Sequence, residues 1–414
     1  MPKGKPVSID PALVEKWIME LAAFGAHSGT GVWRTVYSPE WVAAADAFEK
    51  WGRDAGLAMR RDAVGNVWAR LEGEEGGSAI VSGSHIDTQR PGGRYDGAAG
   101  ALAALIALKA LKEQFGKPRL PVEAVALCEE EGSRFPSAGF WGSRAIVGRI
   151  APGDPDRVVG YDGETIAEAM QAVGLDPDHA QDARRNDIAA FIELHIEQGP
   201  VLEGARLPVA IVDAITGIRH IEVTLTGEQN HAGAFPMDRR RDPMAGFAEI
   251  VSTLIDHAHR LGRPAVTTIG RVHVDPNGAA VVPRSVTFTI DARHPDPKAR
   301  KALYAVHDAV LREVCERRRL SLDVRPVLGH DPCLSDPYLL EVLRSAAAEQ
   351  AIPHLVMASG AGHDSQQMAA VAPVAMIFVR SKEGRSHTPE EFSSVEDLVA
   401  GTRLLAEALY KLAY

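Results

Sequence analysis

Three strand-like runs of this sequence each lead directly into a dense cluster of polar side chains. The runs and their clusters are 79–82 with SHIDT (84–88), 122–127 with EEEG (129–132), and 189–194 with ELHIEQG (193–199). Ligand sites in open α/β sheets lie beyond the carboxyl ends of the strands. The pattern therefore predicts an α/β fold in which clusters that are distant in the sequence meet at one edge of a sheet.

The order of the other segments predicts an α/β domain that is interrupted by a smaller α+β domain. Strands that alternate with helices, such as the apolar helix expected at 98–111, indicate an open, mostly parallel mixed sheet. From about residue 215, period-two strands and two helices, expected at about 243–261 and 297–318, follow in the order β-α-β-β-α-β, which is the ferredoxin-like arrangement. We therefore expect a discontinuous domain of residues 1–214 and 328–414, with a ferredoxin-like insertion at 215–327.

The composition narrows the functional classes. The 414 residues include 45 Lys and Arg against 55 Asp and Glu, a net charge of −10 that argues against binding to nucleic acid or anionic membranes. Three cysteines predict no disulfide framework. Residues 1–17 lack the pattern of a signal peptide, and no apolar run reaches the roughly 20 residues of a membrane span. We expect a soluble cytoplasmic globular protein.

The polar clusters contain a set of potential metal ligands. The candidates are His85, Asp96 in a glycine-rich loop, the three consecutive glutamates 129–131, His195 and His387. This set suits Zn²⁺, Mn²⁺ or Co²⁺, and it exceeds what one closed structural site needs. Taken singly, each feature also fits an ordinary structural role, but together they favour a hydrolytic centre with two metal ions. The spacing does not choose among the three glutamates, because alternation fails where a strand ends.

Eight motifs, spread over nearly the whole chain, resemble those of the binuclear metal-dependent amidohydrolases. They are GSHIDT (83–88), GGRYDGAAG (92–100), EEEGSRF (129–135), ELHIEQGPVLE (193–203), NHAGAFPMDRRRD (230–242), TIDARH (289–294), SGAGHDS (359–365) and MIFV with SHTPEE (376–391). That family includes N-carbamoyl-L-amino acid hydrolases, allantoate amidohydrolases and β-ureidopropionases, and it is related to metal aminopeptidases and aminoacylases. The resemblance implies that the insertion serves as a lid and dimerisation domain.

The resemblance also implies two divalent metal ions in each subunit, either Zn²⁺, Mn²⁺ or Co²⁺. His85, Asp96 and His195 match the ligands of one ion. Asp96 would bridge to a second ion that is held by Glu131 and His387.

The remaining site residues receive their roles from the same resemblance. Glu130 matches the general base, and Asp87 matches the carboxylate that orients the first histidine ligand. Gln198 matches a substrate-contacting glutamine, and Arg293 matches the arginine that binds the substrate carboxylate with two parallel hydrogen bonds. His231 matches a lid histidine that polarises the scissile carbonyl in the neighbouring subunit, which implies a homodimer.

Two positions depart from the family pattern near the expected substrate. The lid motif usually reads HAGTTPM, and this chain has Ala234 and Phe235 in place of the two hydroxyl residues. Ala280 stands where the carbamoyl and allantoate enzymes have an asparagine, which removes an amide donor and acceptor. Asn277, three residues earlier, is a candidate to replace that amide.

These observations lead to one main expectation and two alternatives. The main expectation is hydrolysis of a linear carbamoyl or ureido C–N bond by a metal-activated hydroxide, in an N-carbamoyl-L-amino acid, allantoate or another ureido acid. The departures at Phe235 and Ala280 favour an alternative in which the enzyme is the same but its substrate is an N-acyl amino acid or another carboxylate-bearing amide. The alternative from another class is a catalytically silent homologue that binds metal or a partner, and the intact ligand set argues against it.

Overall fold

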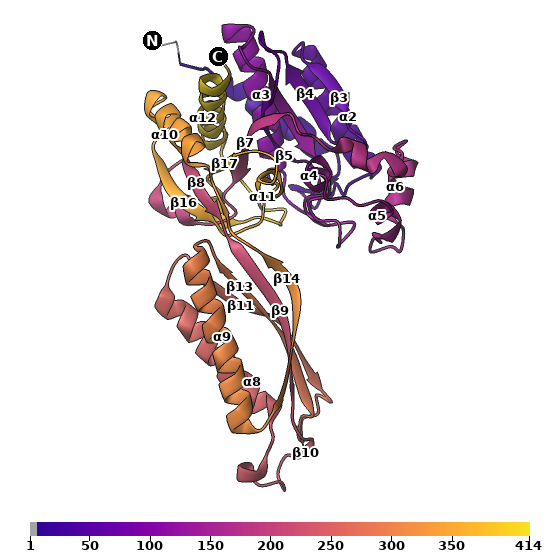
Figure 1. The fold of residues 1–414 in the computed structure, drawn as a ribbon, viewed down its shortest axis with the longest axis vertical. Coiled ribbons are helices and arrows are strands. Elements are labelled where there is room, and N and C mark those ends of the chain that lie inside the picture. Colours follow the sequence, from indigo (N-terminus) through magenta and orange to yellow (C-terminus); the bar gives the residue numbers. More distant parts are fainter. Residues whose placement is uncertain (1–5) are drawn as a thin grey trace. The chain divides into compact units, whose positions relative to one another are not determined.

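The computed structural model describes residues 6–414, which divide into two compact units (Figure 1). The first unit contains residues 6–213, 334–357 and 362–414, and the second contains residues 214–333 and 358–361. Among the described helices, none combines the length and the apolar character that a membrane crossing requires.

The first unit is built on a nine-stranded mixed sheet with the order β15-β8-β17-β7-β5-β6-β4-β3, and β16 pairs with β8. Its four central strands are parallel: β17 (Val374–Val379), β7 (Ile188–Ile196), β5 (Ala79–His85) and β6 (Val122–Leu127). The flanking strands are β8 (Val209–Ile215), β4 (Val67–Leu71), β3 (Ala58–Arg61), β15 (Cys333–Leu334) and β16 (His354–Ser359). Because the central strands are parallel, their carboxyl ends meet at one edge of the sheet.

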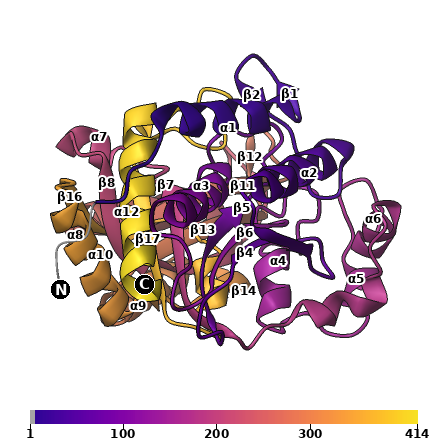
Figure 2. The ribbon, with the colours of Figure 1, turned by 90° about the horizontal axis from the view of Figure 1, so that it is seen from above.

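Helices cover this sheet and enclose the larger core. The apolar helix α3 (Ala98–Phe115) packs against β5, β6 and β7, and α12 (Val395–Ala413) lies beside it against β7 and β17 (Figure 2). The other helices of this unit are α1 (Pro11–Ala23), α2 (Pro39–Asp54), α4 (Trp141–Ile146), α5 (Asp154–Arg157), α6 (Ile166–Ala172), α7 (Val201–Ala205), α10 (Pro337–Glu349) and α11 (Ser365–Met368). Short β1 (Ala26–His27) and β2 (Gly31–Val32) and the 3₁₀ turns Pro177–Ala183 and Lys382–Gly384 complete it.

The second unit has a four-stranded antiparallel sheet with two helices. The strand order is β11-β13-β9-β14, which is the ferredoxin-like arrangement. Its elements are β9 (Gly217–Thr226), β10 (Asn230–His231), the 3₁₀ turn Met237–Arg239, α8 (Pro243–Leu261), β11 (Val266–Asp275), β12 (Val281–Val282), β13 (Ser285–His294), α9 (Pro297–Arg318) and β14 (Ser321–His330). A separate core, which includes Val223, Phe288 and Leu311, stabilises this unit.

Capping residues explain where several helices begin. Asp10, Asp242, Asp296 and Asp336 each precede a proline, and their side chains accept hydrogen bonds from the first-turn N–H groups of α1, α8, α9 and α10. Ser38 does the same for α2. These starts follow from local sequence alone, because proline lacks the N–H that the first turn would leave unpaired.

The predicted fold class, a mixed α/β sheet with a ferredoxin-like α+β unit, is confirmed. The structure extends two of the predicted strands, so that β5 includes His85 and β7 includes His195. It also adds β8, which the sequence pattern does not predict. Central parallel strands are buried on both faces and read as continuous apolar runs. A polar histidine at the end of such a strand interrupts the run, so the sequence pattern ends before the strand does.

Candidate metal centre

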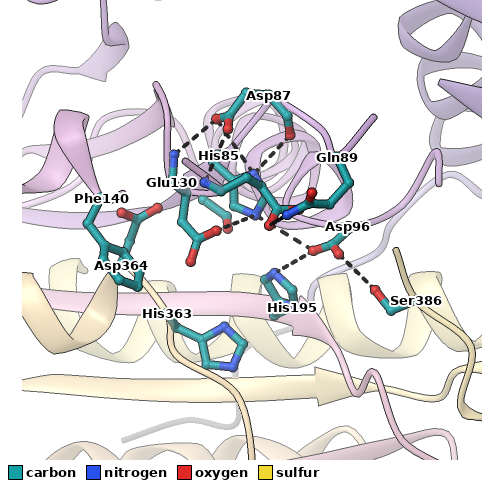
Figure 3. Close-up of polar contacts among 12 residues, drawn as sticks. His85, Asp87, Gln89, Asp96, Glu130, Phe140, His195, His363, Asp364 and Ser386 are labelled. Carbon is teal, nitrogen blue, oxygen red and sulfur yellow. Dashed lines mark hydrogen bonds and ion pairs between the residues drawn. The ribbon is translucent and has the colours of Figure 1, made fainter. Parts of the chain in front are cut away.

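The predicted metal ligands come together at the carboxyl edge of the parallel strands. Figure 3 shows three of them, His85, Asp96 and His195. His85 ends β5, His195 is the next-to-last residue of β7, and Glu131 lies just after β6. Asp96 lies just before α3, and His387 follows β17 in the C-terminal loop. Five chain segments therefore supply one cluster, as the rule for open α/β sheets predicts.

His85, Asp96 and His195 form the first ligand group. Asp96 Oδ1 lies 3.2 Å from His195 Nε2 and 3.6 Å from His85 Nε2. The other ring nitrogens are held by main-chain oxygens, since His85 Nδ1 donates to Asp87 O (3.0 Å) and His195 Nδ1 donates to Ile196 O (2.9 Å). These bonds direct both Nε2 atoms toward the same carboxylate oxygen.

The second ligand group uses the other oxygen of the same aspartate. Asp96 Oδ2 lies 3.2 Å from His387 Nε2, and Glu131 Oε1 lies 3.4 Å from that nitrogen. Gly97 permits this arrangement, because its φ is +62° and a Cβ there would lie 2.4 Å from the His85 ring. Among the described residues, Asp96 is the only carboxylate that belongs both to the group with His85 and His195 and to the group with Glu131 and His387.

The electrostatics of the cluster fit a site for cations. Burial alone would raise the pKa of Asp96, but the hydrogen bonds with His195, His387 and His85 outweigh it and lower that pKa well below its usual range. Burial raises the pKa of Glu131 to about 7, and the hydrogen bond with Asp96 raises the pKa of His387 to about 9. A cation held among these groups would neutralise the carboxylate charge that the neighbouring histidine rings stabilise here.

A buried oxygen that accepts no hydrogen bond also fits a metal. Glu131 Oε1 is buried and accepts no hydrogen bond from the residues that the structure describes. Such an oxygen is costly unless a cation or donor satisfies it. The donor set of imidazole nitrogens and carboxylate oxygens suits Zn²⁺, Mn²⁺ or Co²⁺. His85, Asp96 and His195 would hold one ion, and Asp96, Glu131 and His387 would hold the other.

Glu130 lies beside the first ligand group. Its Oε2 lies 3.8 Å from His85 Nε2, and burial raises its pKa well above the usual range while the His85 ring opposes the rise. The main chain around it is fixed, because Phe140 N donates to Glu130 O (3.0 Å) and Glu130 N donates to Asp87 Oδ1 (3.3 Å). A carboxylate held in this way can accept a proton at the edge of the cluster.

The Asp87 carboxylate lies near His85 and also accepts hydrogen bonds from main-chain N–H groups. Its Oδ1 lies 3.7 Å from His85 Nδ1, but its hydrogen bonds come from the N–H groups of Glu130 and Glu131, each at 3.3 Å. The Asp87 main-chain oxygen is the group that accepts from His85 Nδ1. The geometry thus links Asp87 both to the first histidine and to the glutamate segment.

Gln198 contacts the cluster through its amide nitrogen. Nε2 donates to Asp96 Oδ2 (3.0 Å) and to Ser386 Oγ (3.2 Å), and the residue has a left-handed φ of +56°. Its Oε1 is buried and accepts no hydrogen bond within the described chain. An amide oxygen of this kind is available to an N–H group of a bound ligand.

The other three predicted site residues belong to the second unit. His231 Nδ1 accepts hydrogen bonds from Gly233 N and Ala234 N, both at 3.1 Å, so the Nε2 of this exposed ring carries the proton. Arg293 pairs with Asp291 through Nε (2.8 Å) and Nη2 (3.2 Å).

Arg293 also donates through Nη1 to Gly360 O (2.7 Å). Its guanidinium has five N–H donors, so about two remain for a ligand. Asn277 is exposed and has a φ of +58°, and the main-chain oxygen of Ala280 accepts from Ala232 N (3.1 Å). Phe235 is partly buried.

The structure adds residues that the sequence reading did not assign. Ser386 Oγ lies 2.7 Å from Asp96 Oδ2, and Glu391 accepts from Tyr95 N (2.8 Å) and Asp96 N (2.9 Å). Both lie in the SHTPEE motif, which was a signal for them. Gln89 donates to Glu131 Oε2 (2.8 Å). It lies between the motifs at 83–88 and 92–100, so the resemblance assigned it no role.

Several known proteins are similar to this chain in sequence and in fold. The profile described as Peptidase family M20/M25/M40 matches residues 81–411. The allantoate amidohydrolase of Escherichia coli (strain K12) is 41% identical over 402 residues, which cover 97% of this chain and 98% of that protein. The N-carbamoyl-L-amino-acid amidohydrolase of Paenarthrobacter aurescens is 38% identical over 402 residues, which cover 96% and 97%.

A solved structure gives the same result for the fold. The amidase of the hydantoinase/carbamoylase family from Burkholderia multivorans superposes with a TM-score of 0.91 at 33% identity, and the match covers 98% of both chains. The resemblance that the motifs indicated is therefore confirmed. This chain belongs to peptidase family M20/M25/M40, and its full-length relatives place it among the amidohydrolases of that family.

Proposed function

We propose that this chain hydrolyses a linear C–N bond in a small carboxylate-bearing substrate, most closely an N-carbamoyl-L-amino acid or a ureido acid. One observation carries the proposal: the two oxygens of Asp96 face different ligand groups, and the Glu130 carboxylate lies beside them. The relatives support it, since one is an allantoate amidohydrolase and another an N-carbamoyl-L-amino-acid amidohydrolase.

The residues divide the chemistry among them. Two divalent ions, when bound, would acidify a water molecule and polarise the carbonyl under attack. Glu130 accepts the proton of that water and returns it to the leaving nitrogen. Gln198 Oε1, which has no partner among the described residues, accepts an N–H of the substrate. His231 donates its Nε2–H to the carbonyl oxygen as that oxygen gains charge.

The substrate class follows from the groups that would bind it. The two unused N–H donors of Arg293 bind the carboxylate. A carbamoyl substrate would then yield an amino acid, ammonia and carbon dioxide. Ala280 favours a second candidate, an N-acyl amino acid, because its side chain offers no amide to a ureido group.

A panel of substrates tests the proposal. The chain is loaded with Zn²⁺, Mn²⁺ or Co²⁺ and assayed on matched N-carbamoyl, N-acetyl and ureido acids. We expect turnover of the carbamoyl or ureido members. Exclusive turnover of N-acyl members would establish the second candidate, and no turnover of any amide with two ions bound would reject both enzymatic proposals.

Arg293→Ala should raise KM for a carboxylate-bearing substrate about 10- to 100-fold, because two charge-assisted hydrogen bonds are lost. We expect a smaller change in kcat. Steady-state kinetics measure both constants, and Arg271→Ala is the matched control, since Arg271 is an exposed arginine of the same unit that pairs with Glu222. An unchanged KM would contradict the proposed role of Arg293.

We also propose that His231 acts in the neighbouring subunit of a homodimer. Glu130→Gln and His231→Ala should each be inactive alone, yet a mixture that exchanges subunits should regain about a quarter of the wild-type activity. Half of the random dimers are hybrids, and each hybrid has one site in which both residues are intact. Co-expression with two affinity tags isolates the hybrid. If His231 acted within its own subunit, both hybrid sites would be defective and no activity would return.

A further inference from the structure

Gln89 reaches the metal cluster from the loop that follows β5 (Figure 3). Its Nε2 donates a hydrogen bond of 2.8 Å to Glu131 Oε2. Its main chain is held in place as well, since Thr88 Oγ1 lies 3.0 Å from Gln89 O. The residue is partly buried, and nothing in the mechanism above uses it.

This hydrogen bond makes the two oxygens of Glu131 unequal. Oε2 is occupied by the Gln89 amide, whereas Oε1 is buried, accepts no hydrogen bond in the described part of the chain, and lies 3.4 Å from His387 Nε2. A carboxylate without such a donor can rotate and offer either oxygen, or both together, to a cation. One amide therefore determines which oxygen is available.

We infer that Gln89 is a positioning residue that makes Glu131 a one-oxygen ligand of the ion shared with Asp96 and His387. Partners that orient a ligating carboxylate typically change metal affinity 10- to 100-fold when they are removed. The inference rests on the proposed function in one respect, because it requires that a second metal ion binds; it does not require turnover. It also has a selectivity consequence, because Ca²⁺ accepts both oxygens of a carboxylate and binds at longer distances than Zn²⁺.

The test compares Gln89→Met with the wild-type chain, because methionine has nearly the same length and shape but no N–H donor. Metal-free protein is titrated with Zn²⁺ in a calorimeter, and a His387→Ala variant identifies the binding step of the second ion. We expect the second ion to bind about 10- to 100-fold more weakly to Gln89→Met, and the first ion to bind within about threefold of wild type. The ratio of Ca²⁺ to Zn²⁺ affinity at the second step should rise.

The matched control is Gln350→Met. Gln350 Nε2 donates to Glu407 Oε2 (2.6 Å), which is the same kind of bond in the same unit but outside the metal cluster. We expect Gln350→Met to leave both binding steps unchanged, even if it lowers the unfolding temperature of the metal-free chain. The two variants thus separate a loss of packing from a loss of ligand orientation.

Several outcomes would overturn the inference. Equal weakening of both steps in Gln89→Met would assign the residue a structural role, and wild-type affinity at the second step would show that Glu131 needs no orientation. Failure of the wild-type chain to bind a second ion would also reject it. The titration contains no substrate, so two normal binding steps with no turnover in the substrate panel would reject the proposed function and leave this inference standing.

Discussion

Replacing Glu130 with glutamine should lower kcat by about 10²- to 10⁴-fold, which is the range for loss of a general acid–base group, while both metal ions stay bound. The amide has nearly the shape of the carboxylate but cannot accept a proton. Glu130 belongs to neither group that contains Asp96, and its main chain is fixed by Asp87 and Phe140, so the ligands should keep their positions. Single-turnover kinetics and metal analysis of the purified variant measure the two effects separately.

The neighbouring glutamate supplies the control for this experiment. Glu129 Oε1 accepts from Phe135 N (2.8 Å) and Arg134 N (3.2 Å), away from the ligand groups. Burial raises the pKa of Glu129 to about 8, and glutamine keeps the shape of the side chain and the oxygen that accepts these two hydrogen bonds. We expect Glu129→Gln to keep most of the activity. Substantial turnover by Glu130→Gln, or an equal loss in both variants, would contradict the proposed role of Glu130 as the base.

The three consecutive glutamates show where sequence reasoning reaches its limit. The sheet-edge rule placed all three at the site, and only the resemblance distinguished them. The structure supplies a physical reason for their difference. Glu129 has a left-handed φ of +49°, so the chain turns sharply after β6 and sends successive side chains into different surroundings. No propensity or periodicity predicts a left-handed glutamate, because its conformation depends on tertiary hydrogen bonds.

The fold was more predictable than the support around the site. Helices α8 and α9 begin and end where the sequence predicts, because capping residues and a clear apolar face specify them. Gln89, by contrast, contacts Glu131 across 42 positions of sequence, and its amide is an ordinary polar group without that contact. Side chains that orient ligands carry no spacing pattern, so only the three-dimensional structure identifies them.

The position of Asp96 makes it the residue whose loss should affect the centre most. Its two oxygens face separate ligand groups, His85 and His195 on one side and His387 on the other. The segment before it is also anchored, because the buried Glu391 carboxylate accepts the Asp96 N–H at 2.9 Å. A substitution that keeps the shape but removes the charge therefore acts on both groups at once.

Asp96→Asn should reduce the metal content from two ions to nearly none, with each affinity falling more than about 100-fold, and turnover should fall by at least about 10³-fold. The amide has only one oxygen, and its NH₂ group would face one of the two ion positions without any negative charge. His387→Ala should instead lose only the second ion, because that histidine belongs to one group. Metal analysis after dialysis distinguishes these results.

Asp397→Asn is the control for this substitution, since Asp397 is a buried carboxylate of the same unit that pairs with Arg380 instead of with histidines. It should keep both ions, because its carboxylate takes no part in the ligand groups. If Asp96→Asn retained one tightly bound ion, the aspartate would serve a single group, and the shared-carboxylate arrangement on which the proposed chemistry depends would be wrong.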